Sequence, residues 1–428
     1  MFKKHKRESL TLRRDLNLFD ATIAGIGIIV GAGIYVLIGA ASGYAGNGVW
    51  LSFIISAFVA LLTGLSYAEL SSIYSNDAGE YYYVEHNFGK RIAFVVGYLV
   101  MLSLVLAAAA VSLGFSGYLN SLLNYSYIPG IAIISILVFS IVNTIGIKQS
   151  MRLNVVFTTL SIFGLLMVIF LTLPKIGSIN YFEITRLTGV FKAASLIFFA
   201  YIGFESVVKL SEETINPRKT IPLALLLSLG ISTILYILVS ISAISTIGWR
   251  ELSMSSAPLT DVVSAMVGSN AGFIVTILAL ISTGNTVLLS LIAMSRLIYG
   301  MSKGYKKIKF LSKINRFTKT PLNAIIASTI FTVFFVLIGN VQVVAEITNF
   351  FVFVVFSVIN LALIKSRYSK HRHEMFHEPL NLGKFPLLAL FGFVSTVLML
   401  INLEKIVILF GSLLTGAGFF LYNFTVKK

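Results

Sequence analysis

The chain has 428 residues, of which 57% are hydrophobic and only 12% are charged, and its formal net charge is +16. Domains that fold in water carry about 25% charged residues, so this composition excludes that class and indicates a polytopic membrane protein. Because the chain has no cysteine, disulfides, thiolate metal sites and cysteine nucleophiles are also excluded.

The chain begins with a polar stretch of about twenty residues ahead of the first long apolar block. A secretory signal has only a short charged lead and a short apolar core, so we do not expect one here. Beyond this segment, long apolar blocks predict twelve membrane-spanning helices, with an extra-membrane helical piece at one end of the long eighth block. The spans are expected near Ala21–Tyr44, Val49–Ala68, Ile92–Leu119, Ile128–Ile147, Val155–Leu173, Val190–Leu210, Ile221–Ile247, Ala257–Met301, Ala324–Ile338, Val343–Ile364, Phe385–Ile401 and Ile406–Phe424.

The distribution of positive charge predicts the orientation of these spans. An even number of spans places both termini on one side, and Lys and Arg accumulate in cytoplasmic loops. With the termini in the cytoplasm, the cytoplasmic segments hold 28 of the 33 Lys and Arg residues. The high charge therefore indicates orientation and attraction to anionic lipid, with no nucleic-acid partner. The five basic residues expected on the other face are Lys175, Arg186, Lys192, Arg250 and Lys405.

The first span contains the glycine-rich stretch GIGIIVGAGIY, Gly25–Tyr35. Each glycine in a helix interior costs about 1 kcal/mol relative to alanine, so the stretch requires an explanation. One explanation is close helix packing, because Gly27 and Gly31 form a GxxxG pattern. The alternative is an unwound segment at Gly31, Ala32 and Gly33 whose peptide groups line a cavity.

The sixth span contains a second interruption, in the stretch FFAYIGFESVVKLSEETINPRKTIP from Phe198 to Pro222. This stretch places Gly203 and Glu205 inside an apolar block, where an ionisable side chain usually faces a polar path. The first and sixth spans also begin corresponding five-span halves. Paired interruptions of this kind are typical of inverted-repeat transporters, and they favour the unwound explanation.

These two stretches, together with YAELSSIYSNDAGEYYYVEHNFG at Tyr67–Gly89, resemble three motifs of the amino acid–polyamine–organocation (APC) superfamily of secondary transporters. The resemblance covers nearly the whole chain. It implies an all-α fold with a single transmembrane domain of 12 helices over residues 1–428. The domain would contain a five-plus-five inverted repeat, about residues 17–175 and 188–366, with broken helices 1 and 6 and two extra C-terminal helices at about 384–424.

The resemblance also implies a substrate site made of peptide groups from the two broken helices. Amides of the first helix would meet the α-carboxylate of an amino acid, and carbonyl groups of both helices would meet its α-amino group. An aromatic residue of the sixth helix would act as a gate, with Phe199 as the first candidate and Tyr201 as the second. The implied binding residues are Ile29, Gly31, Ala32, Gly33, Phe199, Ala200 and Ile202.

The third helix would line the side-chain pocket through Ala108 and Val111. Both side chains are small and apolar, which leaves room in the pocket but offers no hydrogen bond. The alternative for the run Ala107–Ala110 is tight packing against a neighbouring helix.

Coupling is expected to differ from the superfamily pattern. Many members carry a lysine on the fifth helix, whereas this chain has none there and places Thr159 near the matching position. Glu205 is then the first candidate for proton coupling, because burial disfavours its charged form. The alternatives for Glu205 are a pair with a cationic substrate, an ion pair with Lys209, and a hydrogen bond to a neighbouring helix.

A sodium site is the second possibility for coupling. Hydroxyls in the eighth block would join first-helix carbonyls around the ion, although hydroxyls in membrane helices more often bond backbone carbonyls. The residues of this candidate cation site are Ser282, Thr283 and Thr286.

Three further groups of charged residues have a functional and a simpler interpretation. Acids near the cytoplasmic end of the second helix would form an inner gate with Arg296 and Lys303, or a solvated loop face, which is favoured. Glu346 would lie in an outer vestibule or be an exposed interfacial acid. The histidines of HRHEMFH have a spacing that metals use, but a solvated loop is favoured. These residues are Glu69, Asp77, Glu80, Glu85, His371, His373 and His377.

We therefore expect an alternating-access amino acid transporter in a prokaryotic plasma membrane, with no cofactor and no catalytic activity. Its partners would be an amino acid, a proton or sodium ion, and membrane lipid. Proton-coupled uptake is the first expectation. An amino acid or amino acid/polyamine exchanger, a sodium-coupled symporter, a non-transporting nutrient sensor and an ion channel are the alternatives.

Overall fold

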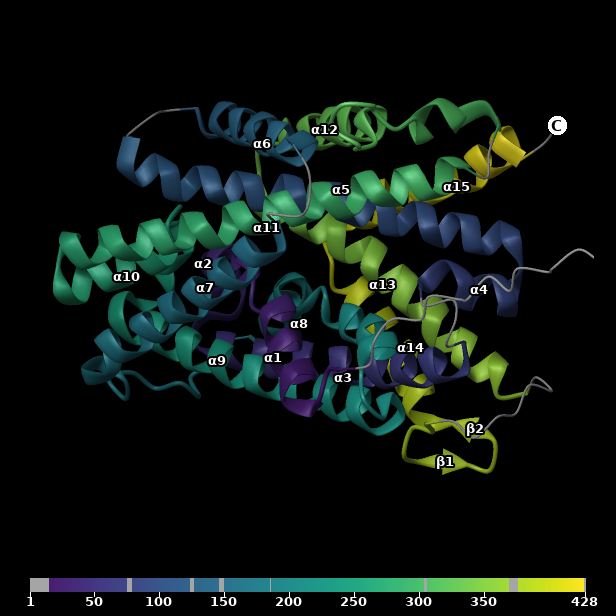
Figure 1. Ribbon diagram of the computed structural model, residues 1–428. Coiled ribbons are helices and arrows are strands. Elements are labelled where there is room, and N and C mark those ends of the chain that lie inside the picture. The colour runs from purple at the N-terminus through teal and green to yellow at the C-terminus, as the bar shows by residue number, and fades with distance from the viewer. Residues whose placement is uncertain are drawn as a thin grey trace, which may run out of the picture.

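The computed structural model describes residues 15–74, 79–123, 127–145, 150–184, 186–303, 306–368 and 376–426. These residues are almost entirely helical (Figure 1). Within them, nine helical segments are long and apolar enough to cross a membrane, and four shorter apolar helices accompany them. The prediction of an all-α, multi-pass membrane protein is confirmed.

The first expected five-helix half contains the glycine-rich interruption. Its α-helices are α1 (Leu18–Ile29), α2 (Ala32–Ala45), α3 (Val49–Ile73), α4 (Glu80–Phe88), α5 (Lys90–Leu123), α6 (Ile128–Ile145) and α7 (Ser150–Thr172), and its short 3-10 helices are η1 (Gly46–Gly48) and η2 (Leu173–Lys175).

The second expected half contains the interruption at Gly203 and is followed by a hairpin and two helices. Its elements are α8 (Leu187–Ile197), η3 (Phe198–Tyr201), η4 (Phe204–Glu213), α9 (Pro217–Met254), α10 (Pro258–Val267), α11 (Ser269–Lys303), η5 (Lys306–Ser312), α12 (Leu322–Val336) and α13 (Val341–Ser366). The antiparallel pair β1 (Asn381–Leu382) and β2 (Phe385–Pro386) then leads into α14 (Leu387–Ile401) and α15 (Lys405–Val426).

Several helix boundaries follow from glycine and proline. The eighth block divides at Gly268, whose φ of 101° ends α10 before α11 begins, so the separate helical piece is present. Proline at the first position of α9 starts that helix at Pro217, because proline needs no amide partner there. Gly248, with φ 75° and ψ 157°, kinks α9 near its end.

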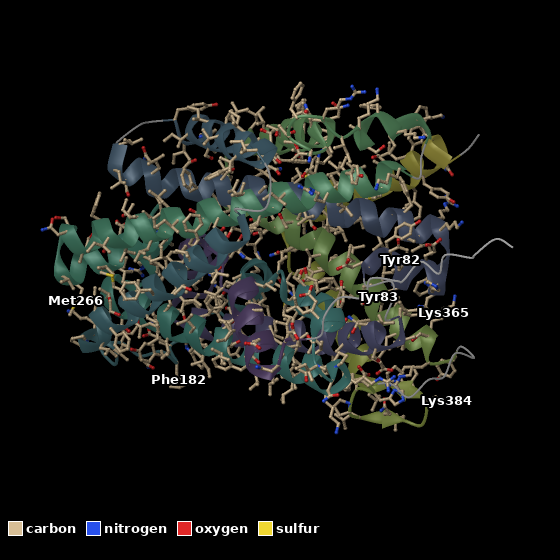
Figure 2. The ribbon with its side chains drawn as sticks, viewed as in Figure 1. Tyr82, Tyr83, Phe182, Met266, Lys365 and Lys384 are labelled. Atoms are coloured by element: carbon tan, nitrogen blue, oxygen red, sulfur yellow. The ribbon has the colours of Figure 1, made fainter. Side chains whose placement is uncertain are left out.

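Helices α6 and α12 pack together at the top of Figure 1 and cover α5, while α1, α3 and α9 are grouped at the bottom. Figure 2 shows the two ends of the molecule, with Lys365 and Lys384 at one end and Phe182 and Met266 at the opposite end. We call the end that carries Lys365 and Lys384 the basic end.

The start of the first broken helix is attached to the end of the second. Asn17 caps α1 through its side chain, which accepts hydrogen bonds from the amides of Phe19 and Asp20. Just before this cap, the amide of Leu16 donates to the carbonyl of Glu213 at 3.0 Å, and the amide of Ile215 donates back to Leu16 at 2.8 Å. This short bridge holds α1 beside η4 at the basic end.

Candidate functional site

The first helix is broken where the glycine-rich sequence predicts. Helix α1 ends at Ile29 and α2 begins at Ala32. Between them, Val30 (φ −77°, ψ 84°) and Gly31 (φ −119°, ψ −149°) have non-helical backbone angles. Close packing also occurs in the same stretch, because a Cβ atom at Gly27 would lie 3.0 Å from Cγ2 of Thr158. The two explanations for the glycines therefore apply to different positions.

The sixth helix is broken at Ile202 and Gly203, between η3 and η4. Gly203 has a φ of 114°, which other residues rarely adopt, and a Cβ atom there would lie 3.3 Å from the carbonyl oxygen of Ile28. After the break, which the sequence predicts, the chain continues as a 3-10 helix from Phe204 to Glu213. The second interruption is thus more extensive than the first.

The two broken helices touch each other directly. A Cβ atom at Gly33 would lie only 2.5 Å from the Cα atom of Ala200, so no side chain fits between α2 and η3 at this point. The hydroxyl of Tyr236, on α9, lies 2.9 Å from the carbonyl oxygen of Ile29 and 3.1 Å from that of Ala200. One buried hydroxyl therefore bridges carbonyl groups of both broken helices.

A cavity of about 260 Å³ lies at the two breaks. This volume is close to the lower end of the range for small-molecule sites, about 300–1,000 Å³. Backbone from both interruptions forms part of its wall, and side chains of α5, α7 and α11 form the rest. These side chains belong to Leu104, Ala107, Asn154, Thr158, Ser161, Ser282, Asn285, Thr286, Leu289, Ser290 and Ala293.

Most of the residues singled out in the sequence lie together at this cavity. Ten of them line it: Ile29, Gly31, Ala32, Gly33, Phe199, Ala200, Ile202, Glu205, Ser282 and Thr286. Five others lie outside its lining: Ala108, Val111, Thr159, Tyr201 and Thr283.

On α5 and α7 the predicted residues lie one or more positions away from the residues that line the cavity, and therefore on another face of the helix. Ala107 faces the cavity, whereas Ala108 and Val111 are fully buried among neighbouring side chains. Thr158 faces the cavity, whereas Thr159 is exposed on the outside of α7 and donates to the carbonyl of Val155 at 2.9 Å. A helix turns by about 100° per residue, so a displacement of one position moves a side chain to another face.

Tyr201 and Thr283 bond to other groups. The hydroxyl of Tyr201 donates to the carbonyl of Phe53 at 3.1 Å and lies 3.3 Å from Thr233. The hydroxyl of Thr283 donates to the carbonyl of Ala279 at 2.7 Å, within its own helix. Neither hydroxyl is directed into the cavity lining.

The hydroxyl side chains of α11 contact the first break. The amide of Ala32 donates to Oγ1 of Thr286 at 3.3 Å, and Thr286 donates in turn to the carbonyl of Ser282 at 3.0 Å. The hydroxyl of Ser282 is buried and has no hydrogen-bond partner among the described residues. The first break and α11 therefore place two polar groups at the cavity: an amide bonded to Thr286, and the Ser282 hydroxyl, which has no partner within the described ranges.

Two polar features of the site were not predicted as parts of it. Tyr236 bridges the broken helices, and Nδ2 of Asn285 donates to Oδ1 of Asn154 at 2.8 Å across the cavity wall. Tyr236 and Asn285 are polar groups inside apolar blocks, which was the available signal in the sequence, whereas Asn154 lies just before the fifth block.

Glu205 lies at the second break and lines the cavity. Its Oε2 atom accepts a hydrogen bond from the amide of Gly203 at 2.9 Å, so the carboxyl group caps the start of η4. This contact places the acid beside the same peptide groups that the interruption exposes.

The cavity extends from the breaks towards the basic end. Gly27 and Ile28 on α1, Ser206 on η4 and Ala293 on α11 line it on that side. On the other side the close contact between Gly33 and Ala200 narrows the space between the broken helices.

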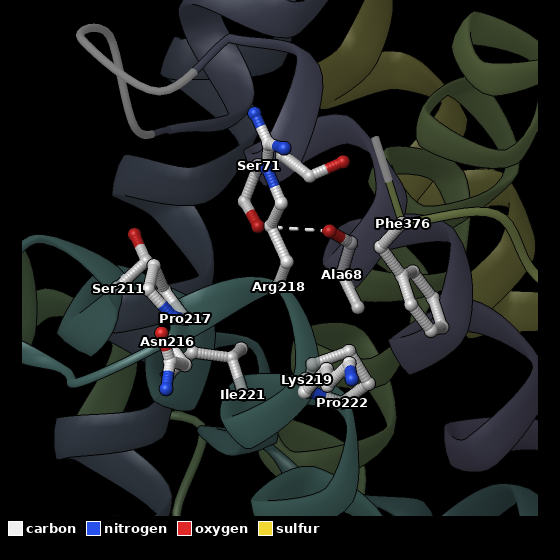
Figure 3. Close-up of a pocket in the computed structure, with 11 residues that line it drawn as sticks. Ala68, Ser71, Ser211, Asn216, Pro217, Arg218, Lys219, Ile221, Pro222 and Phe376 are labelled. Atoms are coloured by element: carbon white, nitrogen blue, oxygen red, sulfur yellow. Dashed lines mark hydrogen bonds between the residues drawn. The ribbon is translucent and has the colours of Figure 1, made fainter. Parts of the chain in front are cut away.

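Two other hollows lie away from the breaks. The larger, about 570 Å³, is at the basic end between α3, η4 and α9 (Figure 3). Its lining includes Arg218, Lys219 and Ser71, whose hydroxyl donates to the carbonyl of Ala68 at 2.9 Å. The second, about 450 Å³, is an apolar groove between α12, α13 and α15. Neither contains the residues singled out as binding residues.

The remaining charged residues are placed differently from the expected inner gate. Glu69 is fully buried and pairs with Arg367, so the solvated-face interpretation is wrong for this residue. The ammonium of Lys303 lies over the ring of Tyr299 at 4.1 Å, and Nε of Arg296 is buried without a hydrogen-bond partner among the described residues. Asp77 lies outside the described residues.

Glu346 is buried, and His377 is the histidine of HRHEMFH that lies among the described residues. Glu346 is only 3% exposed, so the interpretation as an exposed acid is wrong, and its Oε1 accepts from the hydroxyl of Tyr44 at 3.1 Å. His371 and His373 lie outside the described residues. His377 has a side chain that is 57% exposed and lies beside Glu69. Across the described ranges, no group of three or more His, Cys, Asp or Glu residues is arranged to hold a metal ion.

Comparison with known proteins places this site in context. A family described as "Amino acid permease" matches residues 16–421 of the chain. The branched-chain amino acid permease BcaP of Bacillus subtilis is 31% identical over 382 residues, which cover 83% of this chain and 82% of that protein. The methylthioribose transporter of the same bacterium is 30% identical over 406 residues, covering 87% and 86%.

A eukaryotic relative aligns over most of the chain as well. The human cationic amino acid transporter 4 is 30% identical over 387 residues, which cover 84% of this chain but only 61% of that longer protein. The match to the family extends over nearly the whole sequence and includes both broken helices. The chain is therefore a multi-pass membrane protein that belongs to the amino acid permease family of the APC superfamily.

Proposed function

We propose that the protein carries an amino acid across the plasma membrane by alternating access, with the substrate held in the cavity at the two breaks. The observation that carries this proposal is the meeting of two separate helix interruptions at one cavity. Non-helical backbone at membrane depth is tolerated only where it is buried in protein or lines a cavity, and transporters use it to bind ions and zwitterions.

The peptide groups at the breaks have the polarity that a zwitterion needs. The amides at Ala32 and Gly33 begin α2, and the positive end of a helix dipole favours a carboxylate there. The carbonyls of Ile29 and Ala200 are positioned to accept from an α-amino group. In this arrangement the substrate carboxylate takes the place that Thr286 now holds at the amide of Ala32.

The conformation supports a route through the protein. Because basic residues mark the cytoplasmic side, the cavity extends towards the cytoplasm and is constricted on the outer side by Gly33 and Ala200. We propose that the helices of the first, second, sixth and seventh spans rock against the remainder to expose the same site to the outside. The two halves, about residues 17–175 and 188–366, are proposed to be inverted repeats.

Coupling to protons is the first proposal, with Glu205 as the group that gains and loses the proton. Because Glu205 accepts a hydrogen bond from the amide of Gly203, a change in the charge of its carboxyl group would alter a contact at the second break. Exchange of one amino acid for another is the second proposal. The hydroxyl of Ser282, which has no hydrogen-bond partner among the described residues, is an observation that favours a cation site. Thr283 lies outside the cavity lining and would not contribute.

The volume and lining favour a small neutral amino acid. A space of about 260 Å³ lined by Ala107, Leu104 and several hydroxyl groups suits a short apolar or hydroxylated side chain. Glu205 also makes a cationic amino acid a candidate. The names of the relatives add branched-chain and cationic amino acids and methylthioribose to the compounds worth testing.

A binding screen on the purified protein tests this proposal. Thermal unfolding is followed with each of the twenty amino acids, common polyamines and methylthioribose. A ligand present at 100 times its Kd should stabilise the folded state by about 2.7 kcal/mol. We expect one chemical class of amino acid to raise the Tm and then to be taken up by proteoliposomes. A Tm that responds to none of the amino acids would contradict the proposal.

A further inference from the structure

A group of four polar side chains lies at the basic end, outside the substrate cavity. Glu69 comes from the end of α3, Arg367 caps α13, and His377 and Glu378 come from the segment before β1. We call these four residues the inner cluster. They join three helices, because Glu378 also contacts the first turn of α14 through Ala389.

Glu69 is the fully satisfied acid of the inner cluster. Its carboxylate pairs with the guanidinium of Arg367, and Nη2 of Arg367 donates to Oε2 of Glu69 at 2.6 Å. The amide of Glu378 donates to the same oxygen at 2.9 Å, and Nδ1 of His377 lies 3.4 Å from Oε1. The carboxylate of Glu69 is therefore surrounded by donors from three different residues.

Glu378 has a different environment. It is only 1% exposed, and its Oε1 atom accepts from the amide of Ala389 at 3.1 Å. Its Oε2 atom is buried and has no hydrogen-bond partner among the described residues. A charged carboxylate that lacks partners in a buried site costs far more free energy than a neutral carboxyl group. This burial, together with the charge of Glu69, raises the pKa of Glu378 to about 7.

We propose that Glu378 is a proton-responsive switch, and that its neutral form docks the segment 376–389 onto α3 and α13. Loss of the proton places a second buried negative charge beside Glu69, with Arg367 as the cation between them. The charged form favours movement of Glu378 into water, which breaks the contacts to Glu69 and Ala389.

The switch has a consequence for transport that depends on the proposed function. The inner cluster ties α3, from the group of helices proposed to rock, to α13 and α14 in the remainder. Because the cluster lies at the end predicted to be cytoplasmic, it would respond to cytoplasmic pH. A proton-coupled carrier would thereby change its rate as the cell interior becomes acidic.

Hydrogen exchange of the whole protein in detergent tests the switch without requiring transport. Exchange of peptides covering residues 376–389 is measured from pH 6 to pH 8 in wild type, Glu378→Gln and Glu251→Gln. The Gln variant corrects for the intrinsic pH dependence of exchange, and Glu251 is an exposed acid elsewhere in the chain. From pKa values of about 7 in the docked state and 4.5 in water, opening should increase about tenfold over this range.

We expect this increase in wild type and in Glu251→Gln, and its loss in Glu378→Gln. Equal pH dependence in wild type and Glu378→Gln would overturn the switch. Uptake by proteoliposomes with the lumen buffered at each pH then tests the link to transport. Proton coupling alone makes uptake depend on luminal pH, so Glu378→Gln should weaken this dependence relative to wild type and Glu251→Gln without abolishing it. If no variant transports amino acids while the exchange result holds, the proposed function fails and the switch stands.

Discussion

The hydroxyl of Tyr236 lies 2.9 Å from the carbonyl oxygen of Ile29, at the last residue of α1 before the break. The same hydroxyl lies 3.1 Å from the carbonyl of Ala200 in η3. A side chain of α9 therefore connects the two broken helices at the level of the cavity. The connection uses carbonyl groups that we propose for the substrate's amino group, so substrate binding and the contact between the helices are linked.

The variant Tyr236→Phe tests this linkage. Removal of the hydroxyl leaves two buried carbonyl groups without this donor, which should cost about 1–3 kcal/mol of stability. We expect the variant to have a lower Tm without substrate and to lose uptake. We also expect the increase in Tm on adding substrate to be larger for the variant than for wild type. Tyr201→Phe is the matched control, because Tyr201 is equally buried but bonds Phe53 and Thr233 outside the cavity. Equal uptake by wild type and Tyr236→Phe would remove this residue from the site.

The contact between Gly33 and Ala200 predicts that even one added methyl group is harmful. In Gly33→Ala, the new Cβ would lie 2.5 Å from the Cα of Ala200, so the broken helices must separate. Such overpacking costs about 1–3 kcal/mol and should abolish uptake while membrane insertion continues. The control is Gly230→Ala on α9, where a new Cβ meets no atom within 4 Å. Uptake by Gly33→Ala at the wild-type rate would show that the contact has no role in transport.

Glu205→Gln tests the coupling role. Glutamine still offers a carbonyl oxygen to the amide of Gly203, so the cap on η4 is retained while the titratable group is lost. We expect wild-type uptake to increase as the external pH falls and the variant to lose this dependence while it still binds the amino acid. The measurement is initial uptake against external pH, with Glu251→Gln as the control. An unchanged pH profile would exclude Glu205 as the coupling group.

The alternative of sodium coupling is tested by replacing sodium with potassium in the buffer and by removing the hydroxyl of Ser282. Because Thr283 lies outside the cavity lining, a sodium ion at the first break would rely on Ser282 and Thr286. We expect uptake to be the same in sodium and potassium buffers for wild type and Ser282→Ala. A requirement for sodium, with a higher sodium concentration needed by Ser282→Ala, would establish the alternative.

The sequence predicts the breaks well because their causes are local. Glycine at positions 31 and 203, and an acid at 205, are unfavourable in a membrane helix unless the backbone there is irregular. Both interruptions are present in the structure, and the residues beside them line one cavity. The long eighth block likewise contains the glycine that divides it into α10 and α11.

The remaining parts of the site depend on which face of each helix is turned to the cavity and on how the helices pack. The sequence of a block that is apolar throughout does not show either. A block such as the fifth span is hydrophobic on all faces, so its sequence does not distinguish Thr158 from Thr159. The bridge from Tyr236 and the pair of Asn154 with Asn285 join residues that are far apart in the chain. Their partners are determined by how the helices pack.

Counterflow in proteoliposomes is the most direct test of the central claim, that the two breaks together hold and carry an amino acid. Vesicles loaded with the unlabelled amino acid identified by binding are diluted into a trace of the labelled compound. We predict transient accumulation of label by wild type and by Gly230→Ala, and none by Gly33→Ala. Label that only equilibrates across wild-type vesicles, or equal accumulation by Gly33→Ala, would contradict the account.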